Sequence, residues 1–404
     1  MCFLQYAPFD AEGGLKFWGH YSSDDLVSWR YEGVPLYPDS SYDCHGVYSG
    51  SAIVEDENAA SFFSPEISKV DGDYDYINNG RQASTLHVES EDGVHFSAKE
   101  VAVDYRNYPE DYTQHVRDPK VWKDSADYFM ALGRSKKNDQ GAVLIYKSED
   151  LKNWDYDKEI TTEEPFGYMW ECPDLFEMDG QLYIICCPQG VETQGIDYEN
   201  VHQVTAMKLD YDFDTDEYEI TDIKLFDRGF DFYAPQTFED ESGRRILIGW
   251  MGIPDADYTN PTEEAGWQHA LTIPRELSVR DGKLIQEPIE ELKQLRSEDK
   301  AVCTFCYGQT IIMQNAIYEA VVDFKRCREM VMTLREGITL SYKDNILTLN
   351  LGVYGSGRST RKVRLEKLEH LQIFADTSSL EIFVNLWRRS FYNKNLQSLW
   401  KTTD

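Results

Sequence analysis

A strand–turn–strand pattern recurs along this chain and limits the folds that it can adopt. Each copy has an apolar run, an acidic or glycine-containing turn and a second apolar run; the copies span residues 119–130, 173–184 and 236–248. A shorter motif that ends in an aromatic residue recurs at residues 23–29, 90–96 and 148–154. Repeated units of short, alternating strands are typical of the blades of a β-propeller. In such a fold the heads of equivalent strands line one central channel.

The helical pattern is nearly absent before residue 285. Apolar residues then recur every three to four positions over residues 285–296, with Pro288 near the start, which predicts a short helix. We therefore expect a propeller over residues 1–284 and a linker helix over 285–299. Alternating runs at 317–324, 346–351 and 380–384 predict a β-sandwich over 300–404.

The charge of the chain excludes one class of partner. Its 404 residues include 72 acidic and 40 basic side chains, which gives a net charge of −32. Such a chain repels a phosphate backbone, so we expect no nucleic acid partner. We expect a neutral small molecule as the substrate. The sequence has no apolar segment long enough to span a membrane and no basic, cleavable N-terminal signal. We expect a cytoplasmic protein without membrane contact.

The cysteines and histidines do not form a metal site in the sequence. Cys303 and Cys306 make the sole C-x-x-C, and no second pair accompanies them. The eight cysteines are expected to be free and mostly buried thiols, and the eight histidines form no ligand-like cluster. We expect no metal and no cofactor. The sequence carries no signal for the oligomeric state.

Two acidic motifs stand at the heads of the repeated strands. They are Arg117-Asp118-Pro119 and Glu171-Cys172-Pro173, and their equivalent positions predict that both carboxyl groups reach the central channel. Retaining hydrolysis of a glycosidic bond needs two carboxyl groups about 5–5.5 Å apart, one protonated and one attacking. Paired carboxylates in a channel therefore favour glycoside chemistry.

The neighbours of each carboxyl group predict its role. Apolar residues 168–170 precede Glu171 and disfavour its charged form, which suits a general acid. The guanidinium of Arg117 is expected to keep Asp118 ionised and able to bind sugar hydroxyls. A glutamate at a strand end and an ordinary ion pair in a turn are the simpler alternatives.

Nine motifs, in order along the chain, extend from Phe3 to about Val384. The chain resembles glycoside hydrolase family 32, which comprises invertases, sucrose-6-phosphate hydrolases and fructanases. So many ordered matches are highly specific. The motifs are FLQYAP (3–8), FWGH (17–20), DDLVSW (24–29), LYPD (36–39), GVYSGSA (46–52), HVRDPKV (115–121), WECPDL (170–175), DFYAPQTF (231–238) and IPREL (273–277).

The resemblance implies an all-β fold, a five-bladed β-propeller followed by a C-terminal β-sandwich. It implies that Glu171 is the general acid/base and that Asp118, with Arg117, stabilises the transition state. The remaining sites that it implies are a fructose subsite lined by Gln5, Tyr48 and Ser49, a sugar-stacking Trp267, and Trp18 in either the pocket or the core.

Three departures from the family pattern matter. The nucleophilic aspartate of the family lies in an Asn-Asp-Pro-Asn motif, which occurs nowhere in the 404 residues and would precede Met1. We therefore expect a chain truncated at its N-terminus and impaired in catalysis. Pro65 and the lost alternation over residues 59–67 predict a weakened strand, and residues 386–404 also leave the pattern.

The sequence thus predicts an enzyme of the β-fructofuranosidase type, which hydrolyses the fructosyl bond of sucrose, sucrose 6-phosphate or a related fructoside with retention. Two alternatives remain, a non-catalytic fructoside-binding pseudoenzyme and a fructanase that acts on levan or inulin. The negative charge disfavours an anionic substrate unless Arg244, Arg245 or Arg275 faces the pocket.

Overall fold

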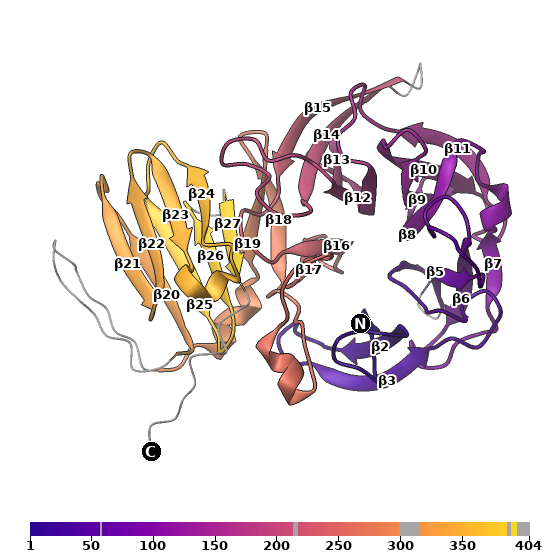
Figure 1. The fold of residues 1–404 in the computed structure, drawn as a ribbon, viewed down its shortest axis with the longest axis horizontal. Coiled ribbons are helices and arrows are strands. Elements are labelled where there is room, and N and C mark those ends of the chain that lie inside the picture. The colour runs from indigo at the N-terminus through magenta and orange to yellow at the C-terminus, as the bar shows by residue number, and fades with distance from the viewer. Residues whose placement is uncertain (57–58, 213–216, 299–315, 386–388, 394–404) are drawn as a thin grey trace.

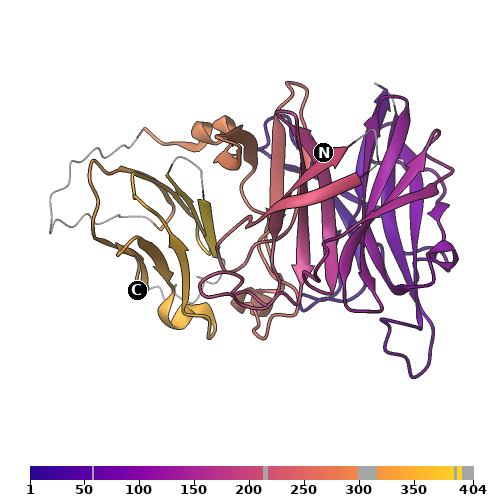
Figure 2. The same cartoon turned by 90° about the horizontal axis from the view of Figure 1, so that it is seen from above.

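Five antiparallel sheets form a ring, and two more form a sandwich beside it, in the computed structural model of the chain (Figures 1 and 2). The structure describes residues 1–56, 59–212, 217–298, 316–385 and 389–393. The expected all-β architecture, five blades followed by a sandwich, is confirmed. Among the described residues, none of the helices is long and apolar enough to cross a membrane.

The blades follow one another along the chain, and the first strand of each complete blade faces the centre of the ring (Figure 1). Blade 1 is β1 (Cys2–Tyr6), β2 (Phe17–Ser22) and β3 (Arg30–Leu36); blade 2 is β4 (Ser51–Asp56), β5 (Ala59–Lys69), β6 (Arg81–Ser90) and β7 (Glu100–Val103); blade 3 is β8 (Tyr112–Asp124), β9 (Asp127–Lys136), β10 (Gly141–Ser148) and β11 (Asp155–Ile160); blade 4 is β12 (Met169–Met178), β13 (Gln181–Gln189), β14 (Thr205–Asp212) and β15 (Glu217–Leu225); blade 5 is β16 (Tyr233–Glu239), β17 (Arg245–Trp250), β18 (Arg275–Arg280) and β19 (Lys283–Pro288).

The sandwich encloses its own apolar core. Residues of both of its sheets, such as Leu340 and Ile382, are fully buried against one another, and Phe230 of the propeller also enters this core. One sheet is β20 (Tyr318–Asp323), β25 (His370–Ala375), β26 (Leu380–Val384) and β27 (Arg389–Asn393), and the other is β21 (Met330–Arg335), β22 (Ile338–Lys343), β23 (Ile346–Asn350) and β24 (Thr360–Arg364).

The shorter sequence repeat forms the same turn in three blades. The carboxylates of Asp25, Asp92 and Asp150 each accept hydrogen bonds from the backbone N–H groups two and three residues later, at 2.7–2.9 Å. This local bonding stabilises the turn without help from the rest of the fold. The turn joins the third and fourth strands of blades 2 and 3, so β1, β2 and β3 occupy the second, third and fourth strand positions of blade 1.

Buried polar contacts tie neighbouring blades together. The ammonium group of Lys120 in blade 3 lies 3.2 Å from the carboxylate of Asp174 in blade 4 and donates a hydrogen bond to the carbonyl of Thr237 in blade 5 at 2.5 Å. The same carboxylate accepts the backbone N–H of Thr237 at 2.6 Å. These contacts fix three consecutive inner strands relative to one another.

The predicted linker helix is wrong in extent and type. Residues 285–288 belong to β19, which pairs with β18, so the expected boundary at residue 284 falls inside a strand of blade 5. Pro288 ends that strand because it has no N–H group to continue the ladder. A short 3-10 helix, η3 (Glu290–Leu295), follows, and Leu292 packs with Leu26 and Val27 of blade 1. The helix thereby contributes to the closure of the ring.

The predicted weakening around Pro65 is also wrong. β5 has 11 residues and pairs with β4 and β6. The nitrogen of Pro65 faces the segment that precedes β4 and cannot donate to the carbonyl of Tyr48 there. That carbonyl accepts hydrogen bonds from Ser64 Oγ (2.9 Å) and from Trp18 Nε1 (2.7 Å). Two side chains thus replace the missing backbone donor, and the ladder to β6 is intact.

The cysteine prediction holds in part. The six described cysteines are free thiols; Cys172, Cys186 and Cys187 are buried, whereas Cys44 is exposed. Cys303 and Cys306 lie outside the described residues. Within the described ranges, no group of three or more His, Cys, Asp or Glu side chains is arranged to hold a metal ion.

One buried charge cluster joins the propeller to the sandwich. The guanidinium of Arg275, fully buried in β18, lies 3.0 Å from the carboxylate of Asp227 and 2.8 Å from that of Glu381 in β26. The other oxygen of Glu381 accepts the backbone N–H of Ile273 at 2.9 Å. Because these charges are buried away from water, the removal of one of them leaves its partners without compensation.

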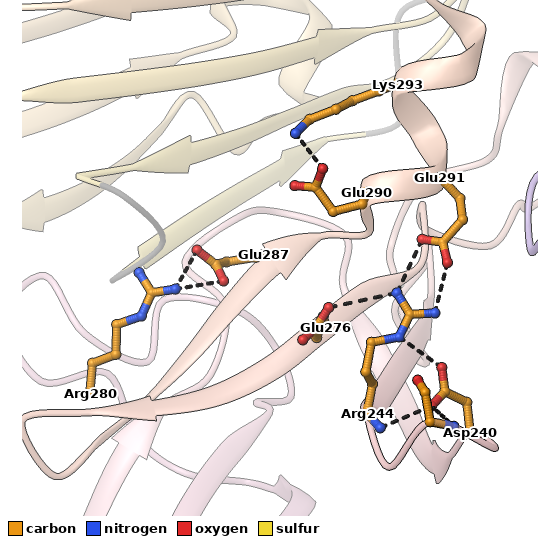
Figure 3. A network of polar contacts seen from close by, with 9 residues as sticks. Asp240, Arg244, Glu276, Arg280, Glu287, Glu290, Glu291 and Lys293 are labelled. Atoms are coloured by element: carbon orange, nitrogen blue, oxygen red, sulfur yellow. Dashed lines mark hydrogen bonds and ion pairs between the residues drawn. The ribbon is translucent and has the colours of Figure 1, made fainter.

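We therefore predict that Arg275→Met lowers the free energy of unfolding by about 3–5 kcal/mol, since it leaves two buried carboxylates without a counter-charge. Arg280→Met is the matched control: Arg280 is half exposed and pairs with Glu287 on the surface (Figure 3), so its loss costs less than about 1 kcal/mol. Urea denaturation measures both. Equal, small losses would contradict the structural role of the cluster.

Candidate active site

The inner strands of blades 3, 4 and 5 share one irregularity. The pairing register shifts directly after Arg117, Glu171 and Tyr233. Such a bulge re-aims the side chains beside it. In each strand the next residue has a left-handed backbone and is followed by a proline: Asp118 (φ 62°), Cys172 (φ 49°) and Ala234 (φ 46°).

These bulges bring side chains of three blades to the carboxylate of Glu171. Its Oε1 lies 2.9 Å from Nε and 2.8 Å from Nη2 of Arg117. Its Oε2 accepts hydrogen bonds from Gln189 Nε2 at 2.8 Å and from the hydroxyl of Tyr233 at 2.6 Å. The predicted convergence of the strand heads is confirmed, and the carboxyl group is fixed through both oxygens.

One expectation from the local sequence is wrong. The guanidinium of Arg117 pairs with Glu171, not with its neighbour Asp118. The apolar residues Met169 and Trp170 are fully buried but do not provide the hydrogen-bonding surroundings of the Glu171 carboxylate. Side chains alternate along a strand, so sequence neighbours need not be spatial neighbours.

Asp118 is buried beside this ion pair. Its Oδ2 accepts the backbone N–H of Cys172 at 3.0 Å and lies 3.6 Å from the Cys172 thiol, which donates to it. Burial, and then the charge of Glu171, raise the pKa of Asp118 to about 6, although Arg117 and the hydrogen bonds from Cys172 oppose this shift. The pKa of Asp118 is therefore raised overall, because burial outweighs the effect of Arg117. With a pKa of about 6 the carboxyl group is still mostly ionised at pH 7.

Gly133 permits the close approach of blades 3 and 4 at this site. It pairs with Arg117 across β8 and β9, and a Cβ atom at this position would lie 2.1 Å from the carbonyl oxygen of Trp170. Any other residue would push β12 away from β9. The reach of Arg117 to Glu171 thus depends on a glycine in the neighbouring strand.

Blades 1 and 2 contribute the residues expected in the fructose subsite. The amide of Gln5 on β1 donates a hydrogen bond to Ser49 Oγ just before β4. Gln5, Tyr48 and Ser49 line one large open hollow with Asp118 and Glu171, and this hollow extends beyond the channel to the sandwich. Their contact with sugar remains a prediction.

The two tryptophans differ in exposure. Trp18 is 3% exposed and packs with Val47 and Phe62, which favours the core alternative; its indole positions Tyr48 through the carbonyl described above. Trp267 is 44% exposed on the segment between β17 and β18, where it lines the same extended hollow. Stacking of Trp267 on a sugar remains a prediction.

Sequence reasoning missed Tyr233 and Gln189. Tyr233-Ala234-Pro235 has its proline in third place, as Glu171-Cys172-Pro173 does. Aligning the two motifs on the proline would therefore have identified Tyr233 as the residue equivalent to Glu171. Gln189 ends β13 and pairs with Met169. Its position depends on the strand register, for which the sequence has no comparable motif.

The three arginines considered for an anionic substrate are engaged elsewhere. Figure 3 shows Arg244 among carboxylates: it contacts Asp240 at 2.8 Å and Glu291 at 2.7 Å. Arg245 lies 3.4 Å from Glu239 and covers the ring of Phe176. Arg275 is buried at the junction with the sandwich, so none of the three is free to bind an anion in the channel.

Two carboxyl groups on neighbouring inner strands, one of them held by hydrogen-bond donors, are the kind of groups that glycoside hydrolases use. Residues 1–288 match the model of the glycosyl hydrolases family 32 N-terminal domain. The chain belongs to glycoside hydrolase family 32, and it is a glycosidase by family.

The chain is similar to proteins named sucrose-6-phosphate hydrolase. It is 35% identical to that of Bacillus subtilis (strain 168) over 95% of this chain and 81% of the relative, and 36% identical to that of Vibrio alginolyticus over 95% and 78%. The structure of sucrose-6-phosphate hydrolase from Lactobacillus gasseri superposes with a TM-score of 0.85 at 28% identity, covering 97% of this chain and 82% of that one. A Bombyx mori β-fructofuranosidase mutant in complex with sucrose gives a TM-score of 0.79 at 26% identity, with the same coverage.

We predict that Asp118→Asn stabilises the folded chain at pH 7.5 more than at pH 5.0, by roughly 1 kcal/mol. The pKa of Asp118 is raised in the folded state, so its ionised form opposes folding above pH 6, and this effect fades as the pH falls and the folded state binds the proton. Urea denaturation of both proteins at the two pH values measures the difference. An equal effect at both would show that Asp118 has an ordinary pKa.

Proposed function

We propose that this chain binds sucrose or a related β-fructoside in the propeller channel, and that Glu171 and Asp118 are the acid/base and the stabilising group with which its family cleaves the fructosyl bond with retention. The observation that carries the proposal is the carboxylate of Glu171, held by Arg117, Gln189 and Tyr233 beside the buried carboxyl group of Asp118. Similarity to sucrose-6-phosphate hydrolases and to a β-fructofuranosidase seen with sucrose supports it. We also propose a cytoplasmic location.

Glu171 serves as the general acid/base in this proposal. In its protonated form it gives the proton to the oxygen that leaves with the second sugar, and its carboxylate then takes a proton from the attacking water. Arg117, Gln189 and Tyr233 orient the carboxyl group during both steps. Their donors contact both of its oxygens, so little reorganisation is needed.

Asp118 serves as the stabiliser of the transition state. It binds fructose hydroxyl groups and, when ionised, places negative charge near the positive charge that develops on the sugar ring. Gln5, Tyr48 and Ser49 complete the fructose subsite, and Trp267 stacks at its rim. Retention further requires an attacking carboxylate, which the family supplies from its Asn-Asp-Pro-Asn motif.

Because that motif is not among the 404 residues, we propose that these residues bind fructosides but turn them over several orders of magnitude more slowly than a chain that carries the motif. The fructoside-binding pseudoenzyme alternative differs from this proposal, since it predicts binding without any release of fructose. The fructanase alternative differs in substrate only and is resolved by the same assay.

The test is fructose release from sucrose, sucrose 6-phosphate, levan and inulin, together with calorimetric binding of sucrose, for the 404-residue chain and for Glu171→Gln. We expect binding by both proteins and only slow release by the parent, which is lost in Glu171→Gln. Glu287→Gln, on the surface of blade 5, is the matched control and should equal the parent.

Fast release that depends on Glu171 would overturn the proposed impairment and establish a working hydrolase. Preferential release from levan or inulin would identify a fructanase. Neither binding nor release by a folded chain would contradict the proposed function itself.

A further inference from the structure

Glu66 is a buried acid on β5 of blade 2, with 1% of its surface exposed. Within the described part of the chain, its carboxyl group forms no ion pair and its Oε2 has no hydrogen-bond partner. The charged groups that act on it are Lys99, Asp43 and Asp39. The ammonium group of Lys99 pairs with both aspartates, so its positive charge is already compensated.

These surroundings favour the protonated form of Glu66. Burial raises the pKa of Glu66 to about 9, and the positive charge of Lys99 opposes this shift only in part. A carboxyl group that is removed from water without a counter-charge keeps its proton, because the neutral form costs less to bury. Glu66 therefore carries an O–H group at pH 7 and can donate a hydrogen bond.

Ser64 connects Glu66 to the segment of the proposed fructose subsite. The two residues are two positions apart in β5, so their side chains lie on the same face, and they form a side-chain hydrogen bond. The hydroxyl of Ser64 also donates to the carbonyl of Tyr48 at 2.9 Å. A hydroxyl group has one proton to donate. Since that proton lies on the carbonyl of Tyr48, Ser64 accepts from Glu66, and Glu66 must be protonated.

The same stretch of β5 holds the backbone of this segment. Val47 pairs with Glu66, and the N–H of Tyr48 donates to the carbonyl of Pro65 at 3.1 Å. Because Pro65 has no N–H group, it cannot bond the carbonyl of Tyr48 in return. The hydroxyl of Ser64 takes this place. The position of Tyr48 therefore depends on the proton that Ser64 donates.

We infer that Glu66 is a positioning residue of the fructose subsite, which acts through Ser64 to hold the segment of Tyr48 in place while Glu66 keeps its proton. The inference rests on the proposed function. When Glu66 loses its proton, the carboxylate becomes the stronger acceptor for the one hydrogen of Ser64, and the carbonyl of Tyr48 loses that donor. Sugar binding then weakens at alkaline pH, although Glu66 itself does not line the hollow.

Calorimetric binding of sucrose to the 404-residue chain at pH 7.0 and pH 10.0 tests the inference without any need for turnover. We expect the affinity of the parent to fall about threefold to tenfold between the two pH values, as the loss of one hydrogen bond does. Glu66→Gln should remove this fall, because an amide donates to Ser64 at both pH values. Glu100→Gln is the matched control: Glu100 is an exposed residue of β7 in the same blade, and its variant should behave as the parent.

Ser64→Ala tests the route from Glu66 to the subsite. Without the hydroxyl, the carbonyl of Tyr48 lacks this donor at every pH. We expect the affinity of Ser64→Ala at pH 7.0 to equal that of the parent at pH 10.0, with no further fall. A folded Ser64→Ala whose affinity falls as that of the parent does would show that Glu66 does not act through Ser64.

A further measurement uses the unaltered chain and needs no bound sugar. The indole of Trp18 donates to the same carbonyl of Tyr48 at 2.7 Å and remains as a donor once Ser64 turns away. In a pH titration followed by NMR of the isotope-labelled indole N–H groups, the Trp18 signal should shift with a midpoint at the pKa of Glu66, about 9. The step should be absent from Glu66→Gln.

Three results would overturn the positioning role while leaving the proposed function in place. They are a parent that binds sucrose equally at both pH values, a folded Glu66→Gln that keeps the full fall, and a Trp18 signal that does not follow Glu66. Failure to bind sucrose at either pH would contradict the proposed function instead. The Trp18 titration would then still decide whether Glu66 controls the carbonyl of Tyr48.

Discussion

The ion pair between Arg117 and Glu171 is the contact on which the site depends. It crosses from blade 3 to blade 4 and requires a bulge after Arg117, a bulge after Glu171 and a glycine at position 133, which allows the strands to approach. Gln189 and Tyr233 then complete the surroundings of the carboxylate from β13 and from blade 5. The geometry of the ring, rather than any single loop, therefore sets the positions of the groups proposed to act on the sugar.

That contact leaves one neighbouring charge incompletely balanced. Asp118 is buried beside Glu171, and burial, followed by the charge of Glu171, raises the pKa of Asp118 to about 6. Perturbed groups of this kind cluster where a protein binds or transforms a ligand. In the proposed function, a fructoside satisfies Asp118 through its hydroxyl groups.

The sequence predicts the part of this arrangement that depends on repetition. Arg117 and Glu171 occupy the same position in successive strand–turn–strand units, and Asp118 follows Arg117 directly. Their convergence therefore follows from the ring symmetry, and the order of family motifs supplies the blade count and the sandwich. The sequence does not predict which partner Arg117 chooses, because that depends on side-chain direction and on the distance between blades. For the same reason the weakening around Pro65 and the helix from residue 285 were wrong: tertiary contacts from Ser64 and Trp18, and pairing of β19 with β18, override the local pattern.

The most direct test of the account is a crystal structure of the 404-residue chain grown with saturating fructose. The account predicts one fructose at the end of the channel, with its hydroxyl groups on the carboxyl group of Asp118 and its anomeric oxygen within hydrogen-bonding distance of Glu171. Fructose bound elsewhere, or a channel that stays empty at saturating fructose, would contradict the assignment of these two carboxyl groups to a fructoside site.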